Sequence, residues 1–264
     1  MVKIIVCIKQ VLDPEAPVSS FKIDPEAKRA ILPKGTPPVL NPFDENALEA
    51  ALRIKDTQGA EITVISMGRQ LARPIVKKSL AAGADELILL EDDAFEDVDS
   101  YSTAYILAGA INKIGEYDLV LCGRQAADTD AGQVGSGIAQ ILGIPSITVA
   151  RKIEASNGKV RVERIVSDGY EVIEAPMPAL VTASSEIGEL RSATVTAIIE
   201  ARKKTVTAWS TNELGIDLCQ LKRVNLLKLF LPPRPQSNCQ IIEGESPEEA
   251  AAILAMKLRE AKIL

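Results

Sequence analysis

The fold is decided by residues 117–142, which read YDLVLC, GRQAADTDAGQ and VGSGIAQIL in succession. The first segment is mostly apolar, as in a buried strand, and the last places its apolar residues at helical spacing. The segment between them is small, polar or glycine, which is typical of a turn. Because strands that run directly into helices build parallel sheets, this stretch predicts an α/β fold.

The turn between this strand and this helix is also a candidate phosphate site. Free backbone N–H groups and the helix dipole favour an anion at a helix start without any basic side chain. Gly132 and Gly135 allow the backbone to approach it closely. Ordinary turns and caps have the same composition, so a purely structural turn stays open at this point. The segment lacks both GxxxxGK[ST] and GxGxxG, which predicts nucleotide binding without hydrolysis.

The same alternation continues on both sides of this stretch. We predict strands at 3–7, 62–66, 86–90 and 146–149, separated by helices at 42–58, 71–82 and 101–114. Residues 159–166 and 170–173 alternate around a Ser-Asp-Gly turn, which predicts an antiparallel hairpin, and 179–182 return as a core strand. The sequence therefore predicts a doubly wound, mostly parallel sheet with an antiparallel addition.

A proline-rich segment at 231–235 separates this sheet from the end of the chain. A capping box at Ser246, with Pro247 at the first helical position, predicts a last helix at 247–261. We therefore predict two parts, a nucleotide-binding α/β domain at 1–230 and a C-terminal arm at 231–264.

Composition excludes several classes of function. The chain has 264 residues, with 36 acidic against 30 basic side chains and a net charge of −6, which argues against a nucleic-acid partner. It contains no histidine, and its four cysteines lie far apart in sequence, so neither a Ser-His-Asp hydrolase nor a zinc site is expected. We predict no catalytic and no metal-ligating residue, and expect a bound cofactor to carry any chemistry.

The chain carries no recognisable leader before Val2 and no apolar run of bilayer length. Its cysteines fit reduced thiols of the cell interior. We therefore expect a cytoplasmic protein without membrane insertion.

Four motifs resemble one family in order and spacing along the whole chain: KQVLD at 9–13, NPFDENALEAA at 41–51, the segment 123–135, and SPEEAAA at 246–252 followed by LREAK at 258–262. They resemble the beta subunit of electron-transfer flavoprotein. The resemblance implies a Rossmann-like α/β fold and a heterodimer with a larger alpha subunit that carries an electron-shuttling FAD. It also implies a second adenine nucleotide in the beta subunit, which is AMP in housekeeping members and FAD in electron-bifurcating members.

The loop sequence shares features with one of the two branches of this family. Gln133-Val134-Gly135 is similar to bifurcating members, whereas Ser136 and the segment Asp128-Thr129-Asp130-Ala131 depart from their pattern. The resemblance therefore favours FAD, with NAD(H) as electron donor, in a subunit of an NADH-dependent oxidoreductase complex. A structural AMP is the alternative within the family, and a stand-alone adenine-nucleotide sensor is the alternative from another class.

By position, the resemblance implies a cofactor site made of Cys7, Ile8, Lys9, Asn41, Ser66, Met67, Gly68, Cys122, Gly123, Arg124, Gln125, Asp128, Thr129, Gly132, Gln133, Val134 and Gly135. All but Asn41 lie at predicted strand ends or in the turns after them, where open α/β sheets bind ligands. Other roles stay open for some of them: packing for the two cysteines and Met67, a surface charge for Lys9, and a helix cap for Asn41.

The resemblance also implies three protein partners. Residues 184–191 would dock a flavin-dependent dehydrogenase, such as an acyl-CoA dehydrogenase, with Ile187 as apolar anchor beside Glu189 and Leu190. The alternative is an ordinary loop whose apolar residues pack inward. Residues 231–264 would reach the alpha subunit, unless the last helix packs on its own chain, and ferredoxin is a further electron acceptor.

Overall fold

The computed structural model describes residues 1–264 except 32–34, 218–220, 222–223, 232–238 and 264. Contacts between residues divide the chain into two units, Met1–Leu229 and Phe230–Leu264.

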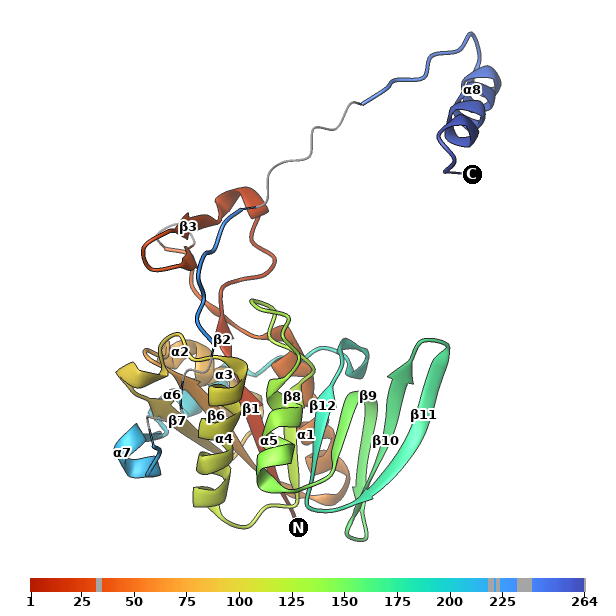
Figure 1. Cartoon of the computed structure of the whole chain (residues 1–264). Helices are drawn as coiled ribbons and strands as arrows, with labels where there is room; N and C mark the ends of the chain where they lie inside the picture. Colours follow the sequence, from red (N-terminus) through yellow and green to blue (C-terminus); the bar gives the residue numbers. More distant parts are fainter. Residues whose placement is uncertain (32–34, 218–220, 222–223, 232–238, 264) are drawn as a thin grey trace. The chain divides into compact units, whose positions relative to one another are not determined.

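A nine-stranded sheet in the order β11-β10-β9-β12-β8-β1-β6-β7-β13 forms the centre of the first unit (Figure 1). Its strands are β1 (Val2–Ile8), β6 (Ala60–Gly68), β7 (Glu86–Glu91), β8 (Leu119–Gly123), β9 (Ser146–Ser156), β10 (Lys159–Val166), β11 (Gly169–Pro176), β12 (Ala179–Ala183) and β13 (Thr207–Trp209). The pairs from β9 to β13 through the centre are parallel, and β10 is antiparallel to both β9 and β11. This confirms the predicted mostly parallel sheet with an antiparallel addition.

Helices cover both faces of this sheet, as the doubly wound pattern predicts. The helices of the first unit are α1 (Pro42–Gln58), α2 (Arg73–Val76), α3 (Lys78–Ala82), α4 (Ser100–Ile114), α5 (Val134–Leu142), α6 (Val195–Lys203) and α7 (Thr211–Leu214). One hydrophobic cluster joins the sheet to α1, α2, α3 and α6, and a second joins its other face to α4 and α5 (Figure 1).

Local sequence explains where the main helices begin and end. Pro42 occupies the first turn of α1, and Gly59 ends it with a φ of 76°. Asp99 begins α4 by accepting a hydrogen bond from the Ser102 N–H at 2.8 Å. Gly143 ends α5 in the left-handed conformation, with a φ of 68°.

Several elements differ from the sequence prediction. The helix predicted at 71–82 is two short helices, α2 and α3, which meet at Lys77. The strand predicted at 146–149 continues to Ser156, past Val149 at a φ of 57° and a register shift against β12. The edge strand β13 and helix α6 were not predicted, because both are short and have mixed polarity.

The segment between β1 and α1 contains small elements away from the main sheet. These are β2 (Gln10–Val11) paired with β5 (Val39–Leu40), the 3-10 turn Val18–Ser20, and β3 (Lys22–Asp24) paired with β4 (Arg29–Ile31). Two further 3-10 turns lie at Asp93–Phe95 and Ser185–Ile187.

The second unit contains the helix α8 (Pro247–Glu260), whose start has the predicted capping box residue. The Ser246 hydroxyl accepts a hydrogen bond from the Glu249 N–H at 3.2 Å. No residue of α8 is buried, and Leu254 and Met256 are 45% and 64% exposed. Across the described ranges, no helix combines the length and apolar character that a membrane crossing requires.

Candidate nucleotide-binding site

The strand order reverses at the carboxyl ends of β1 and β8, and we call this switch point the β1–β8 crevice. The chain leaves β1 through α1 to β6 on one side, whereas β8 pairs with β1 on the other side. Such a reversal of direction is where open α/β sheets bind ligands. The register sets Ile8 opposite Ser66, and pairs Val6 with Leu121, so that Cys7 and Cys122 follow side by side. The fold therefore brings the predicted strand-end residues together.

The first turn of α1 joins these strand ends. One Asp44 carboxylate oxygen accepts the Lys9 N–H at 2.7 Å and the other accepts the Gly123 N–H at 3.0 Å. The Asn41 side-chain amide donates to the Gln125 carbonyl at 2.9 Å, and its oxygen accepts the Ala127 N–H at 3.1 Å. We call Asn41 and Asp44 the α1 clamp, because they fix the end of β1 and the turn after β8 to one another.

The helix-cap role that stayed open for the Asn41 side chain is not observed. Its side chain makes no helix-cap bond, it is 1% exposed, and both ends of its amide are bonded to the turn. It therefore holds the turn that shapes the site, and a direct contact between Asn41 and a ligand stays a prediction.

Asp44 was not predicted as part of the site, although it lies in the quoted NPFDE motif. Burial raises the pKa of its carboxyl from 3.8 to about 7, against the opposite effect of hydrogen bonds from Asn41 and from the Lys9 and Gly123 N–H groups. The sequence signal was a carboxylate in the first turn of a helix, which ordinarily faces solvent and the helix dipole.

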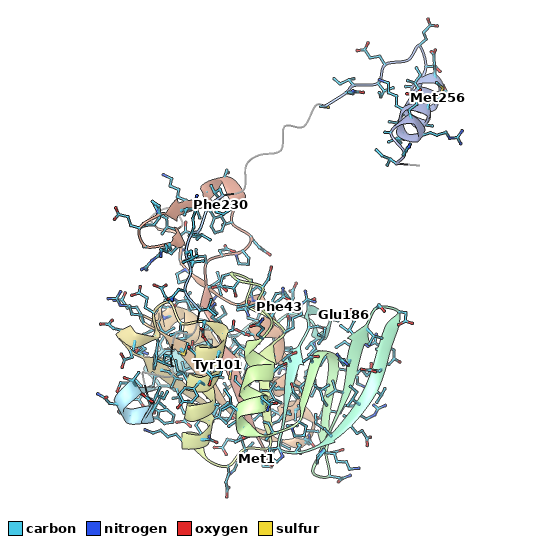
Figure 2. The ribbon with its side chains drawn as sticks, in the orientation of Figure 1. Met1, Phe43, Tyr101, Glu186, Phe230 and Met256 are labelled. Atoms are coloured by element: carbon cyan, nitrogen blue, oxygen red, sulfur yellow. The ribbon has the colours of Figure 1, made fainter. Side chains whose placement is uncertain are left out.

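The turn after β8 is closed by side-chain bonds of its own. The Lys9 ammonium donates to both carboxylate oxygens of Asp128, at 2.8 and 2.7 Å. The Gln125 amide donates to Asp130 at 2.7 Å, and the Arg124 guanidinium lies 4.8 Å from the centre of the Phe43 ring. Phe43 lies at the edge of the sheet where the parallel strands end (Figure 2). Lys9 is therefore a contact between strand and turn, not an isolated surface charge.

Two buried polar atoms beside the crevice have no partner among the described residues. They are the Ser66 hydroxyl oxygen and the Arg124 Nε atom. A buried polar group without a hydrogen bond costs about 1–3 kcal/mol, so unsatisfied groups of this kind fit a bound polar ligand.

Close packing requires glycine at two positions of the site. A Cβ atom on Gly123 would lie 2.5 Å from an Asp44 carboxylate oxygen, and one on Gly135 would lie 2.6 Å from the Thr182 methyl carbon. Gln133, the N-cap residue before α5, makes no side-chain cap bond, and Gly132 precedes it at a φ of 61°. The N–H groups at the start of α5 are thus left without a side-chain cap, as phosphate binding requires.

The remaining predicted residues also lie at this edge. Met67 and Gly68 end β6, Thr129 lies in the exposed part of the turn, and Val134 begins α5. Cys7 and Cys122 are 7% and 5% exposed. A hydrogen bond of the neutral Cys122 thiol with Cys7, together with burial, raises the pKa of Cys122, which favours packing over reactivity for this pair. Cys239 is exposed in the second unit, and Cys219 lies outside the described residues.

The prediction that Ile187 is an exposed docking anchor is wrong. Ile187 is 4% exposed and packs in the cluster that contains α1, and Leu190 is half-buried against the same cluster. The Asn46 amide donates to the Gly188 carbonyl at 2.6 Å, and the Arg191 guanidinium pairs with the buried Glu49. These contacts hold the loop against α1 and turn Ile187 inward.

Polar residues of this loop are exposed, and the apolar surface begins after it. Glu189 is exposed, and Glu186 lies beyond the carboxyl ends of the parallel strands (Figure 2). On the following helix, Val195, Ile198 and Ile199 are 74%, 38% and 47% exposed. We call these three residues the α6 patch. Sequence reasoning missed it, although three apolar side chains within five residues are its signal.

Comparisons with known proteins identify the family of this chain. The model of the electron transfer flavoprotein domain matches residues 30–214. The chain is 40% identical to the caffeyl-CoA reductase-Etf complex subunit CarD of Acetobacterium woodii, over 99% of this chain and 100% of that protein. It is 38% identical to the electron transfer flavoprotein subunit beta of Clostridium acetobutylicum, over 97% and 98% of the two chains. It is 34% identical to the protein FixA of Bradyrhizobium diazoefficiens, over 98% and 92%. With the motifs, the sheet and the relatives in agreement over nearly its full length, the chain belongs to the electron transfer flavoprotein family, among its beta subunits.

Proposed function

We propose that this chain is the beta subunit of a heterodimeric, electron-bifurcating flavoprotein that binds FAD at the β1–β8 crevice. In this proposal NADH supplies the electrons, and ferredoxin and a partner dehydrogenase receive them. The observation that carries the nucleotide site is the start of α5, which has no side-chain cap and follows a glycine turn at the crevice. The motif Gln133-Val134-Gly135, similar to bifurcating relatives, supports FAD over a structural AMP.

The chain's own residues would hold the nucleotide by position and charge. The N–H groups from Gly132 to Gly135 would donate to phosphate oxygens, with the Lys9 ammonium nearby at the end of β1. Ser66 and Arg124 would direct their unsatisfied polar atoms to the ligand. The flavin supplies the redox chemistry when bound, and the α1 clamp keeps the turn in place around it.

The nucleotide set of the complex tests the type of cofactor. This chain is co-expressed with its alpha subunit, the purified heterodimer is denatured, and the released nucleotides are separated and quantified. We expect two FAD per heterodimer and no AMP. One FAD with one AMP would instead show that this subunit holds a structural nucleotide, and would refute bifurcation.

A serine substitution tests the position of the site. Ser66→Ala removes a hydroxyl that has no partner among the described residues, so we expect unchanged stability of the empty subunit and about 5–10-fold weaker nucleotide binding. Ser79→Ala is the matched control, because the Ser79 hydroxyl is buried but donates to the Val76 carbonyl at 2.7 Å. It should lower stability and leave nucleotide affinity unchanged. Equal affinity of Ser66→Ala and the unmodified chain would remove Ser66 from the site.

We further propose that the dehydrogenase docks on the α6 patch. Val195 is the most exposed of its three apolar residues, and a small apolar centre with charged neighbours suits a transient interface. Glu200, Lys203 and Lys204 supply charged neighbours on the same helix end.

The second unit is proposed as the arm that binds the alpha subunit. None of the residues of α8 is buried within the unit, so its exposed Leu254 and Met256 have apolar surface to bury against a partner. Deletion of residues 231–264 should release the alpha subunit during co-purification. A stable heterodimer after the deletion would refute this role.

A further inference from the structure

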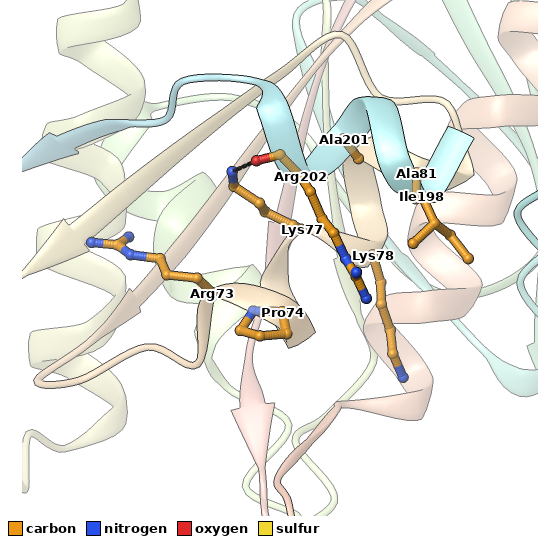
Figure 3. Close-up of a pocket in the computed structure, with 8 residues that line it drawn as sticks. All are labelled: Arg73, Pro74, Lys77, Lys78, Ala81, Ile198, Ala201 and Arg202. Carbon is orange, nitrogen blue, oxygen red and sulfur yellow. Dashed lines mark hydrogen bonds between the residues drawn. The ribbon is translucent and has the colours of Figure 1, made fainter. Parts of the chain in front are cut away.

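A cavity of about 420 Å³ lies between α2, α3 and α6, apart from the predicted nucleotide site (Figure 3). Its lining contains four cationic side chains, Arg73, Lys77, Lys78 and Arg202, and apolar surface from residues such as Ile198. No acidic side chain of the described residues lines it. None of the residues predicted to hold the nucleotide lines it either, so the cavity is separate from that site, although it shares Ile198 with the α6 patch.

Two of the four cations have structural partners. Arg73 pairs with Glu91. The Lys77 ammonium donates to the Arg202 carbonyl at 3.0 Å and to the Lys204 carbonyl at 2.8 Å, and so holds the last turn of α6. The charged groups of Arg73 and Lys77 therefore have partners within the chain and do not require a ligand.

The other two cations, Lys78 and Arg202, have no comparable partner for their charged groups. Within the described part of the chain, neither side chain has a hydrogen-bond or ion-pair partner. Lys78 lies within electrostatic range of Glu45, where burial raises the pKa of the Glu45 carboxyl and the Lys78 charge acts against that rise. Figure 3 shows both side chains extending in the same direction from α3 and α6. Two like charges that share a cavity repel one another, and none of the acidic side chains that the structure describes lies in the lining to offset them. A ligand with two negative charges would neutralise both.

The shape and chemistry of the cavity indicate which anion fits. A guanidinium binds two phosphate oxygens with a matched pair of hydrogen bonds, and an ammonium adds a point charge. The volume lies at the lower end of the range for small-molecule sites, about 300–1,000 Å³. Pro74 and Ile198 form an apolar part of the lining, against which a compact organic group could pack. We propose that this cavity binds a small phosphorylated metabolite, a phosphate monoester or diphosphate, through Lys78 and Arg202.

Calorimetric titration of the purified heterodimer, with its resident nucleotides in place, tests this site. The probes are inorganic pyrophosphate and phenyl phosphate, each at constant ionic strength. We expect saturable binding that weakens at least tenfold in the double variant Lys78→Met/Arg202→Met. Both positions are exposed, so we expect its melting temperature to stay unchanged. The nucleotide content of the same preparations is measured separately, which distinguishes failure of this site from failure of the proposed function.

A matched pair on the distal hairpin controls for net charge. Lys159→Met/Arg161→Met removes the same two charges from β10, and we expect less than a twofold change in affinity. Equal weakening in both double variants, or no saturable binding of either probe, would overturn the proposal. Preferential binding of a hexaglutamate peptide, lost in Lys78→Met/Arg202→Met, would also overturn it and assign the cavity to a protein partner.

Discussion

Substitution of Gly135 by alanine tests the close approach of α5 to the sheet. The added Cβ atom would lie 2.6 Å from the Thr182 methyl carbon, whereas carbon atoms in favourable contact are about 3.5–4.0 Å apart. Either α5 or β12 must move by about 1 Å, and overpacking of this kind costs about 1–3 kcal/mol. Alanine regains up to about 1 kcal/mol of helix propensity. We therefore expect Gly135→Ala to lower the free energy of unfolding by about 1–2 kcal/mol.

A second substitution, Thr182→Ser, removes the clashing methyl group. Serine keeps the hydroxyl oxygen that accepts the Val149 N–H at 3.0 Å, so the variant alone should lose about 1 kcal/mol for one buried methyl group. Once this methyl is gone, the nearest atoms to the new Cβ lie at 3.5 Å on Leu180 and 3.7 Å on Cys122, which is ordinary contact. We expect Gly135→Ala/Thr182→Ser to be at least as stable as Thr182→Ser, a clear departure from additivity.

Urea unfolding of the four chains, followed by circular dichroism, gives the coupling free energy. Gly143→Ala is the control, since a Cβ there meets nothing within 4 Å and only the positive φ of 68° opposes it. Thr182→Ser should not rescue this control. An unchanged stability of Gly135→Ala, or equal effects of Thr182→Ser on both glycine variants, would refute the reasoning. Nucleotide retention in the heterodimer should fall in Gly135→Ala and return in the double variant.

Three further predictions concern the clamp, the docking patch and the loop. Burial raises the pKa of the Asp44 carboxyl in the native state to about 7, above its value of 3.8 in the unfolded chain. The stability that this carboxyl contributes is therefore largest below pH 3.8 and is lost as the pH rises through 7. Urea unfolding between about pH 5 and pH 8 should show that the loss of stability caused by Asp44→Asn shrinks as the pH rises. Val195→Glu should slow electron transfer to the dehydrogenase at unchanged melting temperature, whereas Ile187→Glu should unfold the subunit. An unaffected transfer rate in Val195→Glu would remove the α6 patch from the interface. Arg191→Met should lower the free energy of unfolding by about 1–3 kcal/mol, because it leaves the buried Glu49 carboxylate with one ion-pair partner fewer. An unchanged melting temperature would contradict a contribution of this ion pair to stability.

Local signals in the sequence predicted the main helices and the core strands. The bounds of α5 follow from its apolar spacing and from Gly143, and α1 follows from Pro42 and Gly59. These residues act on their own turn of chain, so their effect is visible without the rest of the fold. The break at Lys77 is different, because Lys77 bonds to carbonyl groups of α6 that lie 125 and 127 residues away in sequence.

The sequence predicted which strand ends would come together, but it did not predict which side chains would join them. Asp44 reads as a carboxylate at a helix start, but its bonds reach residues 35 and 79 positions away. Ile187 is turned inward by contacts between α1 and the loop that span 142 residues. The period of apolar residues says little about a single isoleucine in a loop, so only the tertiary contacts decide its direction.

The α1 clamp has a consequence for the order in which the chain folds. Its four bonds join residues separated by 35, 79, 84 and 86 positions, so the turn after β8 acquires its shape only after β1, α1 and β8 have assembled. Contacts of such separation form slowly, and a nascent chain that ends before Ala127 lacks the last of these bonds. A ligand at this crevice would bind only the assembled sheet, and by mass action it would protect the whole first unit against unfolding and proteolysis instead of one loop.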